Sequence, residues 1–179
     1  MKNEVDGRRE IASRNTAWAN IIARKLTHWG VTPNQISMMS VFFAMVGCLL
    51  LIGTVIYPGF NKYVAYILFI VCMQSRLLCN LFDGMVAIEG GKKSANGDLY
   101  NDMPDRFADA LFIIPVGYVA GGFGIELGWL AALLAVMTAY FRWIGAYKTH
   151  QHFFNGPMAK QHRMALVTAP FGVATCTIY

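Results

Sequence analysis

Apolar residues form long runs along this chain, and short polar segments separate them. Five runs are predicted to be membrane-spanning helices, because a helix needs about 20 mostly apolar residues to cross a bilayer. They cover residues 35–57, 63–82, 105–119, 127–147 and 164–179, and the chain barely completes the last of them. Turns rich in glycine or proline follow the first run at 58–62 and the third at 121–124. The pattern predicts an all-α fold, a polytopic membrane helical bundle.

Residues 10–29 follow a helical period instead of forming an unbroken apolar run. The large apolar residues of this segment fall on one side of the predicted helix: Ile11, Trp18, Ile21, Ile22, Leu26 and Trp29. Such an amphipathic helix either lies flat in a membrane interface or packs on the surface of the protein. We therefore predict two regions, a cytoplasmic, interfacial N-terminal segment over residues 1–34 and a transmembrane domain over residues 35–179.

The composition is typical of a membrane protein. Hydrophobic residues make up 56% of the chain and charged residues 14%, whereas a soluble domain has about 45–50% apolar and about 25% charged residues. These values exclude a disordered chain and argue against an ordinary soluble domain. The expected environment is the lipid bilayer, and nucleic acid is not an expected partner.

Basic residues are distributed unevenly over the predicted loops. Lysine and arginine gather in the N-terminal region and in the segments 84–104 and 148–163, whereas 58–62 and 120–126 together contain only Lys62. Because loops with excess lysine and arginine stay on the cytoplasmic side of a membrane, the first set is predicted to face the cytoplasm.

Acidic residues are concentrated where the second and third predicted spans meet the loop between them. Six of the ten acids lie between Asp83 and Asp109. Oxygen-bearing or small residues recur on one helix face on each side of this loop: Asn80, Asp83 and Ala87 before it, and Asn101, Asp105 and Asp109 after it. Arg76 lies one turn before Asn80 on the same face. Since hard divalent cations prefer oxygen ligands, the pattern predicts a site for Mg²⁺ or Mn²⁺, with two ions able to hold a phosphoryl group.

The loop between these helix ends has the composition of a phosphate-binding segment. Gly84 and Gly97 flank it, and glycine lets a backbone approach a ligand closely. Lys92 and Lys93 add positive charge between them. A ligand with phosphate groups is therefore expected beside the acidic residues.

These residues resemble the signature of the CDP-alcohol phosphotransferase family, which reads D-x-x-D-G-x-x-A-R, eight residues, G-x-x-x-D-x-x-x-D. The segment Val31-Thr32-Pro33-Asn34-Gln35-Ile36 is also similar to the usual opening of that family. The resemblance implies six spans, so five to six are expected here, and two divalent ions in a site facing the cytoplasm. It further implies transfer of a phosphoalcohol group from a CDP-alcohol, often CDP-diacylglycerol, to an acceptor hydroxyl, with release of CMP in phospholipid biosynthesis.

The chain departs from this signature at several positions. Asn80 stands where the family has its first aspartate, and Ile88 where it has arginine. Without a gap, the third and fourth aspartates correspond to Asn101 and Asp105. With one helical turn inserted after Gly97, they correspond to Asp105 and Asp109. We favour the inserted turn at this stage, because it supplies three carboxylates for the metal ions instead of two.

The resemblance also implies a role for each matched residue. The predicted metal ligands are Asp83, Asp105, Asp109, Asn80 and Asn101. Asp109 is the predicted base that accepts the proton of the acceptor hydroxyl, and Asp105 is a ligand or a base in either register. The CDP-alcohol is expected to contact Gly84, Ala87, Gly97, Lys92 and Lys93. An acceptor phosphate is expected to contact Arg142, Lys160 and Arg163, since these cations lie on the same membrane side as the acids.

Two other interpretations remain at this stage. The segment 101–109 also resembles the N-D-x-x-D-x-x-x-D motif of membrane prenyltransferases, although no second aspartate-rich loop follows Asp109. Alternatively, the chain is a cation-binding membrane protein without catalysis. The expected sixth span is either missing from this sequence or replaced by a homodimer partner, and the expected location is the inner or plasma membrane of a bacterium.

Overall fold

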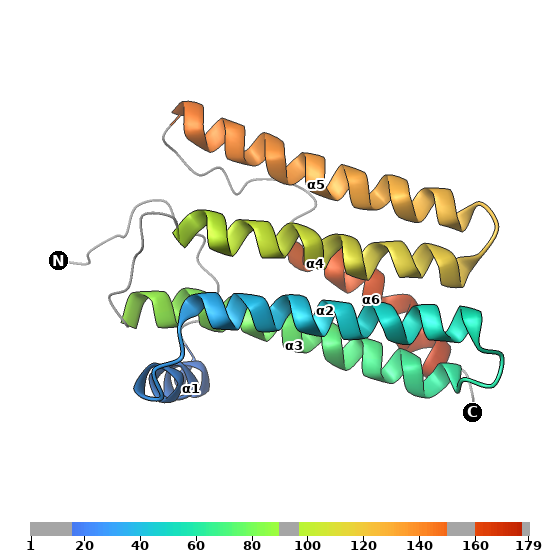
Figure 1. The fold of residues 1–179 in the computed structure, drawn as a ribbon, viewed down its shortest axis with the longest axis horizontal. Helices are drawn as coiled ribbons and strands as arrows, with labels where there is room; N and C mark the ends of the chain where they lie inside the picture. The colour runs from blue at the N-terminus through green and yellow to red at the C-terminus, as the bar shows by residue number, and fades with distance from the viewer. Residues whose placement is uncertain (1–15, 90–96, 150–159, 177–179) are drawn as a thin grey trace.

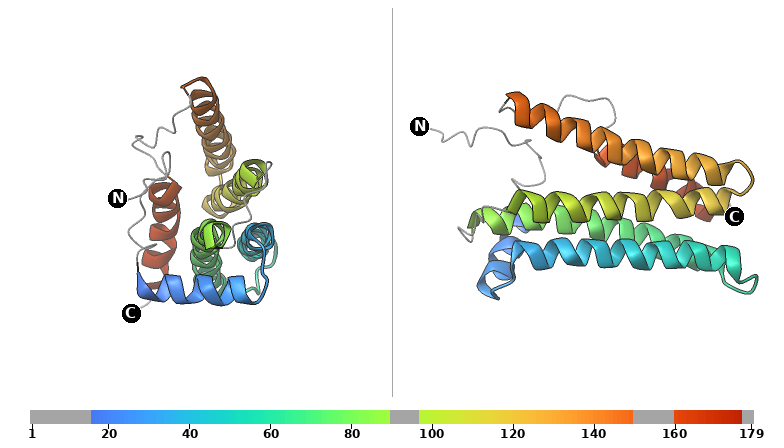
Figure 2. Two further views of the ribbon diagram at one scale, coloured as in Figure 1. Left: turned by 90° about the vertical axis from the view of Figure 1, so that its left-hand side faces the viewer. Right: turned by 45° about the horizontal axis from the view of Figure 1, so that its top comes forward.

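The computed structural model describes residues 16–89, 97–149 and 160–176, and this part of the chain contains only helices. The six helices are α1 (Ala17–His28), α2 (Pro33–Ile56), α3 (Lys62–Glu89), α4 (Gly97–Ala120), α5 (Gly124–Thr149) and α6 (Lys160–Cys176). The predicted all-α fold is confirmed. Helices α2 to α5 run roughly side by side with alternating direction, and α1 lies across one end of them (Figures 1 and 2).

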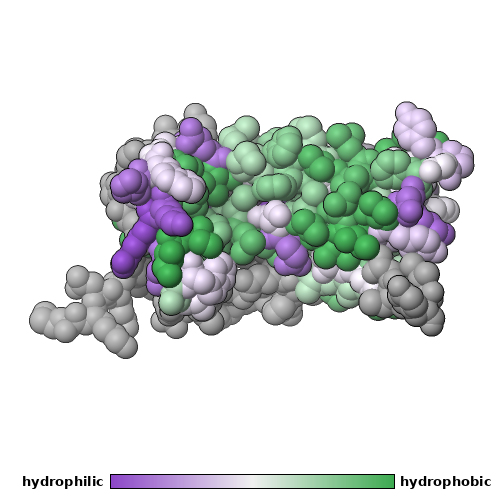
Figure 3. All heavy atoms as spheres, turned by 90° about the horizontal axis from the view of Figure 1, so that it is seen from below, coloured by the Kyte–Doolittle hydropathy of each residue, from purple (hydrophilic) through white to green (hydrophobic). Residues whose placement is uncertain are grey.

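Three helices of the described residues are long and apolar enough to cross a membrane. They cover Pro33–Ile56, Lys62–Ile88 and Gly124–Phe141, and a shorter apolar helix covers Met164–Ala174. On the face shown in Figure 3, apolar residues fill most of the middle of the molecule, and hydrophilic residues gather toward its ends. This distribution suits a bundle with its middle in a bilayer. The full count of five to six spans stays a prediction.

The polar segment expected between the second and third spans is shorter than the sequence pattern predicted. Helix α3 continues through the expected loop to Glu89, and α4 already begins at Gly97. The extension of α3 is stabilised by packing, because Leu81, Phe82, Met85 and Val86 form one apolar cluster with residues of α1 and α2. The acidic residues therefore belong to helices and not to a loop.

Helix α1 packs on the end of α3 through its smallest side chains. Ala19 and Ala23, one turn apart, are fully buried against Phe82 and its neighbours. Several larger apolar residues of α1 are more exposed, including Trp18 at 45% and Ile21 at 59%. The ring of Trp18 nevertheless meets that of Phe82 edge to face, and Leu26 packs on the same apolar cluster. Helix α1 therefore packs part of its apolar face on the protein, and its position in a membrane interface stays a prediction.

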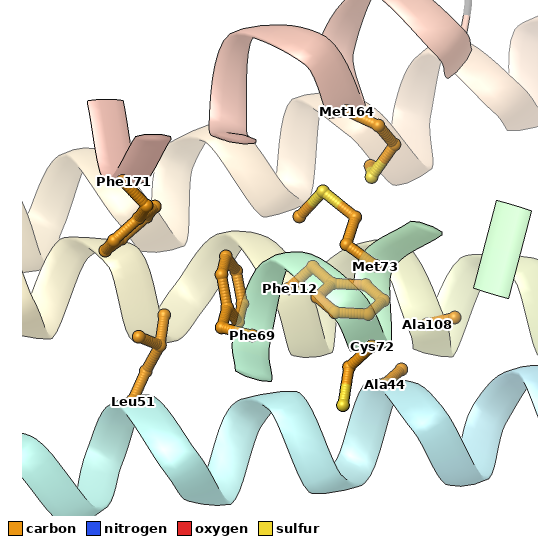
Figure 4. Close-up of a cluster of buried hydrophobic side chains, with 9 residues drawn as sticks. All are labelled: Ala44, Leu51, Phe69, Cys72, Met73, Ala108, Phe112, Met164 and Phe171. Carbon is orange, nitrogen blue, oxygen red and sulfur yellow. The ribbon is translucent and has the colours of Figure 1, made fainter. Parts of the chain in front are cut away.

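The main core lies between α2, α3, α4 and α6. Leu51 and Ala44 of α2 face the rings of Phe69 on α3 and Phe112 on α4, as Figure 4 shows. These two rings meet edge to face with their centroids 5.5 Å apart. Helix α6 adds Phe171, whose ring lies 5.0 Å from that of Phe69. Aromatic contacts therefore join α3 and α4 in the middle of the bundle.

Helices α4 and α5 pack through glycine. A Cβ atom added to Gly117 of α4 would lie 2.5 Å from the carbonyl oxygen of Gly124 and 3.0 Å from the Cα of Gly128. Small residues let two membrane helices bring their backbones together in this way. The contact explains why α5 lies along α4 after the short turn at 121–123.

Replacing Gly117 by alanine is expected to destabilise the protein by about 1–3 kcal/mol, because the added methyl group meets backbone atoms that cannot rotate away. Thermal unfolding in detergent measures this change. Gly172→Ala on α6 is the matched control, since a Cβ atom there meets no atom within 4 Å, and alanine favours helix by about 1 kcal/mol over glycine. Equal shifts for the two variants would contradict the proposed packing.

Candidate functional site

The predicted acidic site residues lie on α3 and α4, toward the end of the bundle that α1 covers (Figure 1). Asp83 belongs to the last two turns of α3, and Asp105 and Asp109 follow the start of α4. Both helix ends lie near the beginning of α2 (Figure 1). Helix α2 packs along both α3 and α4, and their backbones approach α2 more closely than they approach each other. Long side chains must therefore make the polar contacts between α3 and α4.

Asp83 is buried beside the first turns of α2. Its residue is only 3% exposed, and the hydroxyl group of Ser37 donates a hydrogen bond to its Oδ2 at 3.2 Å. Ser37 is positioned by α2, which begins at a capping box in which Thr32 and Gln35 exchange hydrogen bonds. A buried carboxylate is stabilised by such a donor. The turn before α2 therefore helps to place Asp83.

Arg76 joins α3 to the two aspartates of α4. Its Nη2 donates to Asp109 Oδ1 at 2.6 Å, and it lies 3.3 Å from Asp105 Oδ1 and 3.3 Å from the carbonyl oxygen of Asp105. The side chain of Arg76 is fully buried, that of Asp109 is 2% exposed and that of Asp105 is 18% exposed. Of the two aspartates, Asp105 is therefore the more exposed.

Further buried polar atoms lie at the same level of α3. Arg76 Nε, Arg76 Nη1 and Asn80 Nδ2 have no hydrogen-bond partner among the described residues. Arg76 and Asn80 are one helical turn apart, so these donors lie on one face of α3. This face carries more hydrogen-bond donors than the described residues use.

The structure does not bring the expected three carboxylates together as a metal centre. Within residues 16–89, 97–149 and 160–176, no group of three or more His, Cys, Asp or Glu residues is placed to hold a metal ion. In this structure Asp105 and Asp109 contact Arg76, while Asp83 contacts Ser37. The binding of two ions by Asp83, Asp105 and Asp109 stays a prediction.

For most of the other predicted site residues the structure gives the helix that carries them. Gly84 and Ala87 lie on the last turns of α3, and Gly97 and Asn101 lie in the first turns of α4. Ile88, which replaces the arginine of the signature, is 55% exposed. Lys92 and Lys93 lie outside the described residues. Arg142 belongs to the second half of α5, and Lys160 and Arg163 belong to the first turn of α6.

Two contacts of the site were not predicted from the sequence. The contact between Ser37 and Asp83 joins residues 46 positions apart, and a serine in an apolar run gave no signal of it. The helical spacing predicted that Arg76 shares a face with Asn80 and Asp83, but it did not predict the ion pair between Arg76 and Asp109. The spacing was the available signal. Arg76 lies four residues before Asn80 and Asp109 lies four residues after Asp105, so each lies one helical turn further from the loop on the same helix face.

Comparison with known proteins supports the resemblance found in the motif. The sequence model of a family described as CDP-alcohol phosphatidyltransferase matches residues 30–176. A comparison with curated proteins finds no match. The matched range begins just before α2 and ends at the last residue of α6, so it includes the contacts of Ser37, Arg76, Asp83, Asp105 and Asp109. This favours the first of the two motif resemblances over that with membrane prenyltransferases.

Proposed function

The chain belongs to the CDP-alcohol phosphatidyltransferase family, a family of phosphotransferases, and we propose that it transfers a phosphatidyl group from CDP-diacylglycerol to an alcohol. CMP is the second product, and the reaction is a step of phospholipid biosynthesis. The apolar helices α2, α3 and α5, together with the family, describe an integral membrane protein. A donor with two acyl chains suits an enzyme whose substrate is held in the bilayer.

The exposure of the Asp105 side chain is the observation from which we choose the general base. Asp105 is the aspartate of the Arg76 ion pairs whose side chain is partly exposed, at 18%, whereas that of Asp109 is almost completely buried. We propose that Asp105 accepts the proton of the acceptor hydroxyl. The acceptor oxygen then forms a bond to the phosphorus that carries the alcohol, and the bond from this phosphorus to the CMP oxygen breaks.

This assignment supports the register without an inserted turn. In that register Asn80, Asp83, Asn101 and Asp105 occupy the four aspartate positions of the signature. Asp109 then lies one turn deeper, where it contacts Arg76. The earlier preference for Asp109 as the base rested on the number of carboxylates, and the buried ion pair with Arg76 argues against it.

We retain Mg²⁺ or Mn²⁺ as part of the proposal. Asp83 and the amide oxygens of Asn80 and Asn101 are oxygen donors of the kind that these ions prefer. The described residues do not complete a metal site, so we assign no step of the reaction to the metal.

The remaining predicted contacts belong to the two substrates. Gly84, Ala87, Gly97, Lys92 and Lys93 are proposed to contact the CDP-alcohol. Arg142, Lys160 and Arg163 are proposed to contact a phosphate of the acceptor. The proposed location is a bacterial inner or plasma membrane, with this end of the bundle facing the cytoplasm, because the basic segments of the chain are expected there.

The proposal is tested by CMP release from CDP-diacylglycerol. Protein purified in detergent is mixed with the donor, with one acceptor from a panel of polyols, amino alcohols and their phosphates, and with or without Mg²⁺. We expect CMP to form only when both an accepted alcohol and Mg²⁺ are present. Folded protein that releases no CMP with any acceptor, but binds Mn²⁺, would instead support the cation-binding protein without catalysis.

A further inference from the structure

We propose that Arg76 is a positioning residue of this transferase, and that Asp109 is its buried counter-ion. This inference rests on the proposed function and extends it to residues that do not touch substrate. Arg76 contacts Asp105 and fixes the position of its carboxylate. Asp109 neutralises the charge of Arg76 inside the bundle.

A buried arginine inside a membrane span is costly. Arg76 has no exposed side-chain surface and lies in a helix that is long and apolar enough to span a membrane. A charged side chain at such a position needs a partner of opposite charge. Asp109 supplies it, because its Oδ1 lies 2.6 Å from Nη2 and its side chain is only 2% exposed.

Arg76 contacts Asp105 as well as Asp109. The same Nη2 atom lies 3.3 Å from Asp105 Oδ1 and 3.3 Å from the carbonyl oxygen of Asp105. One nitrogen atom thus contacts both the side chain and the backbone of the accessible aspartate. These contacts fix the direction of the Asp105 carboxylate relative to α3.

Arg76 also links helix α3 to helix α4. Helices α3 and α4 approach each other less closely than either approaches α2. Aromatic rings join them at Phe69 and Phe112, and Arg76 joins them nearer to the site. Since α3 carries Asp83 and α4 carries Asp105, this link sets how the two halves of the motif face each other.

The test separates positioning from a merely structural ion pair. Arg76→Met and Asp109→Leu are made singly and together, and Lys25→Met on the exposed face of α1 is the control for loss of a cation. The double variant removes one positive and one negative charge together, so neither is left buried without the other. It is therefore expected to unfold near the wild-type temperature. Its kcat for CMP release is expected to stay about 10–100-fold below wild type, the usual cost of losing a group that orients a functional side chain.

Two further measurements sharpen the test. The KM for CDP-diacylglycerol is expected to change little in the double variant, because Arg76 acts on Asp105 and not on the donor. Arg76→Lys keeps the charge but lacks the planar fork of arginine, so we expect nearly normal unfolding with a reduced kcat. A double variant with wild-type stability and wild-type kcat would overturn the positioning role alone. Wild-type protein without CMP release would overturn the proposed function and this role with it.

Discussion

Replacing Asp105 by asparagine is expected to slow CMP release by about 10²–10⁴-fold, the usual contribution of a positioned general base. The amide has nearly the shape of the carboxylate and keeps an oxygen atom that can accept from Arg76 at the site of the 3.3 Å contact. The fold should therefore survive, while the group that accepts the proton of the acceptor hydroxyl is lost. Initial rates of CMP release at saturating donor and acceptor measure the effect.

The control for this variant is Glu126→Gln. Glu126 lies in the first turn of α5, at the other end of the bundle, and its side chain is exposed. Loss of this carboxylate should leave the rate unchanged. Normal turnover in Asp105→Asn, together with its loss in a folded Asp109→Asn variant, would contradict the register proposed above and restore the one with an inserted turn.

The fold was predictable where hydrophobicity alone decides the structure. The apolar runs at 35–57, 63–82 and 127–147 correspond to α2, α3 and α5, and these three helices have the length and composition of membrane spans. The ends of α3 and α4 were not predictable in the same way. The helical spacing of their polar residues indicated two helix ends, but it did not show where each helix stops. The contact of Phe82, Met85 and Val86 with α1 and α2 explains why α3 continues to Glu89.

Helix α1 illustrates a second limit of the pattern. The sequence shows which residues share a face, but it does not show which face packs on protein. The buried residues of α1 are Ala19 and Ala23, whereas Trp18 and Ile21 are exposed. Small side chains let α1 come close to α3, and this preference depends on the shape of the neighbouring helix.

The site was predictable as a set of residues but not as a set of pairs. The spacing of Asn80, Asp83, Asp105 and Asp109 predicted two helix ends, and the structure places these residues on α3 and α4. Their role as a site stays a prediction. Counting carboxylates favoured Asp109 as a functional group, because a sequence does not show depth in the bundle. Depth is what separates the 2% exposed side chain of Asp109 from the 18% exposed side chain of Asp105.

The single variant Arg76→Met is expected to destabilise the folded protein by about 3–5 kcal/mol. This is the usual cost of removing one partner of a buried ion pair, because the other charge stays buried and loses its counter-ion. Here that charge belongs to Asp109, whose shortest contact with Arg76 is 2.6 Å. Methionine fills a similar length of side chain, so loss of packing contributes little. Unfolding of the purified protein by titration with a denaturing detergent measures the change.

Asp109→Leu gives the complementary single variant, since it leaves the charge of Arg76 without its closest partner. Asp105 still lies 3.3 Å from Arg76, so we expect a smaller loss of stability than in Arg76→Met, where Asp109 has no cation at that contact. If the two single losses simply add in the double variant, the charges are not coupled. In that case the contact between Arg76 and Asp109 would not be the link that holds α3 to α4 beside the site.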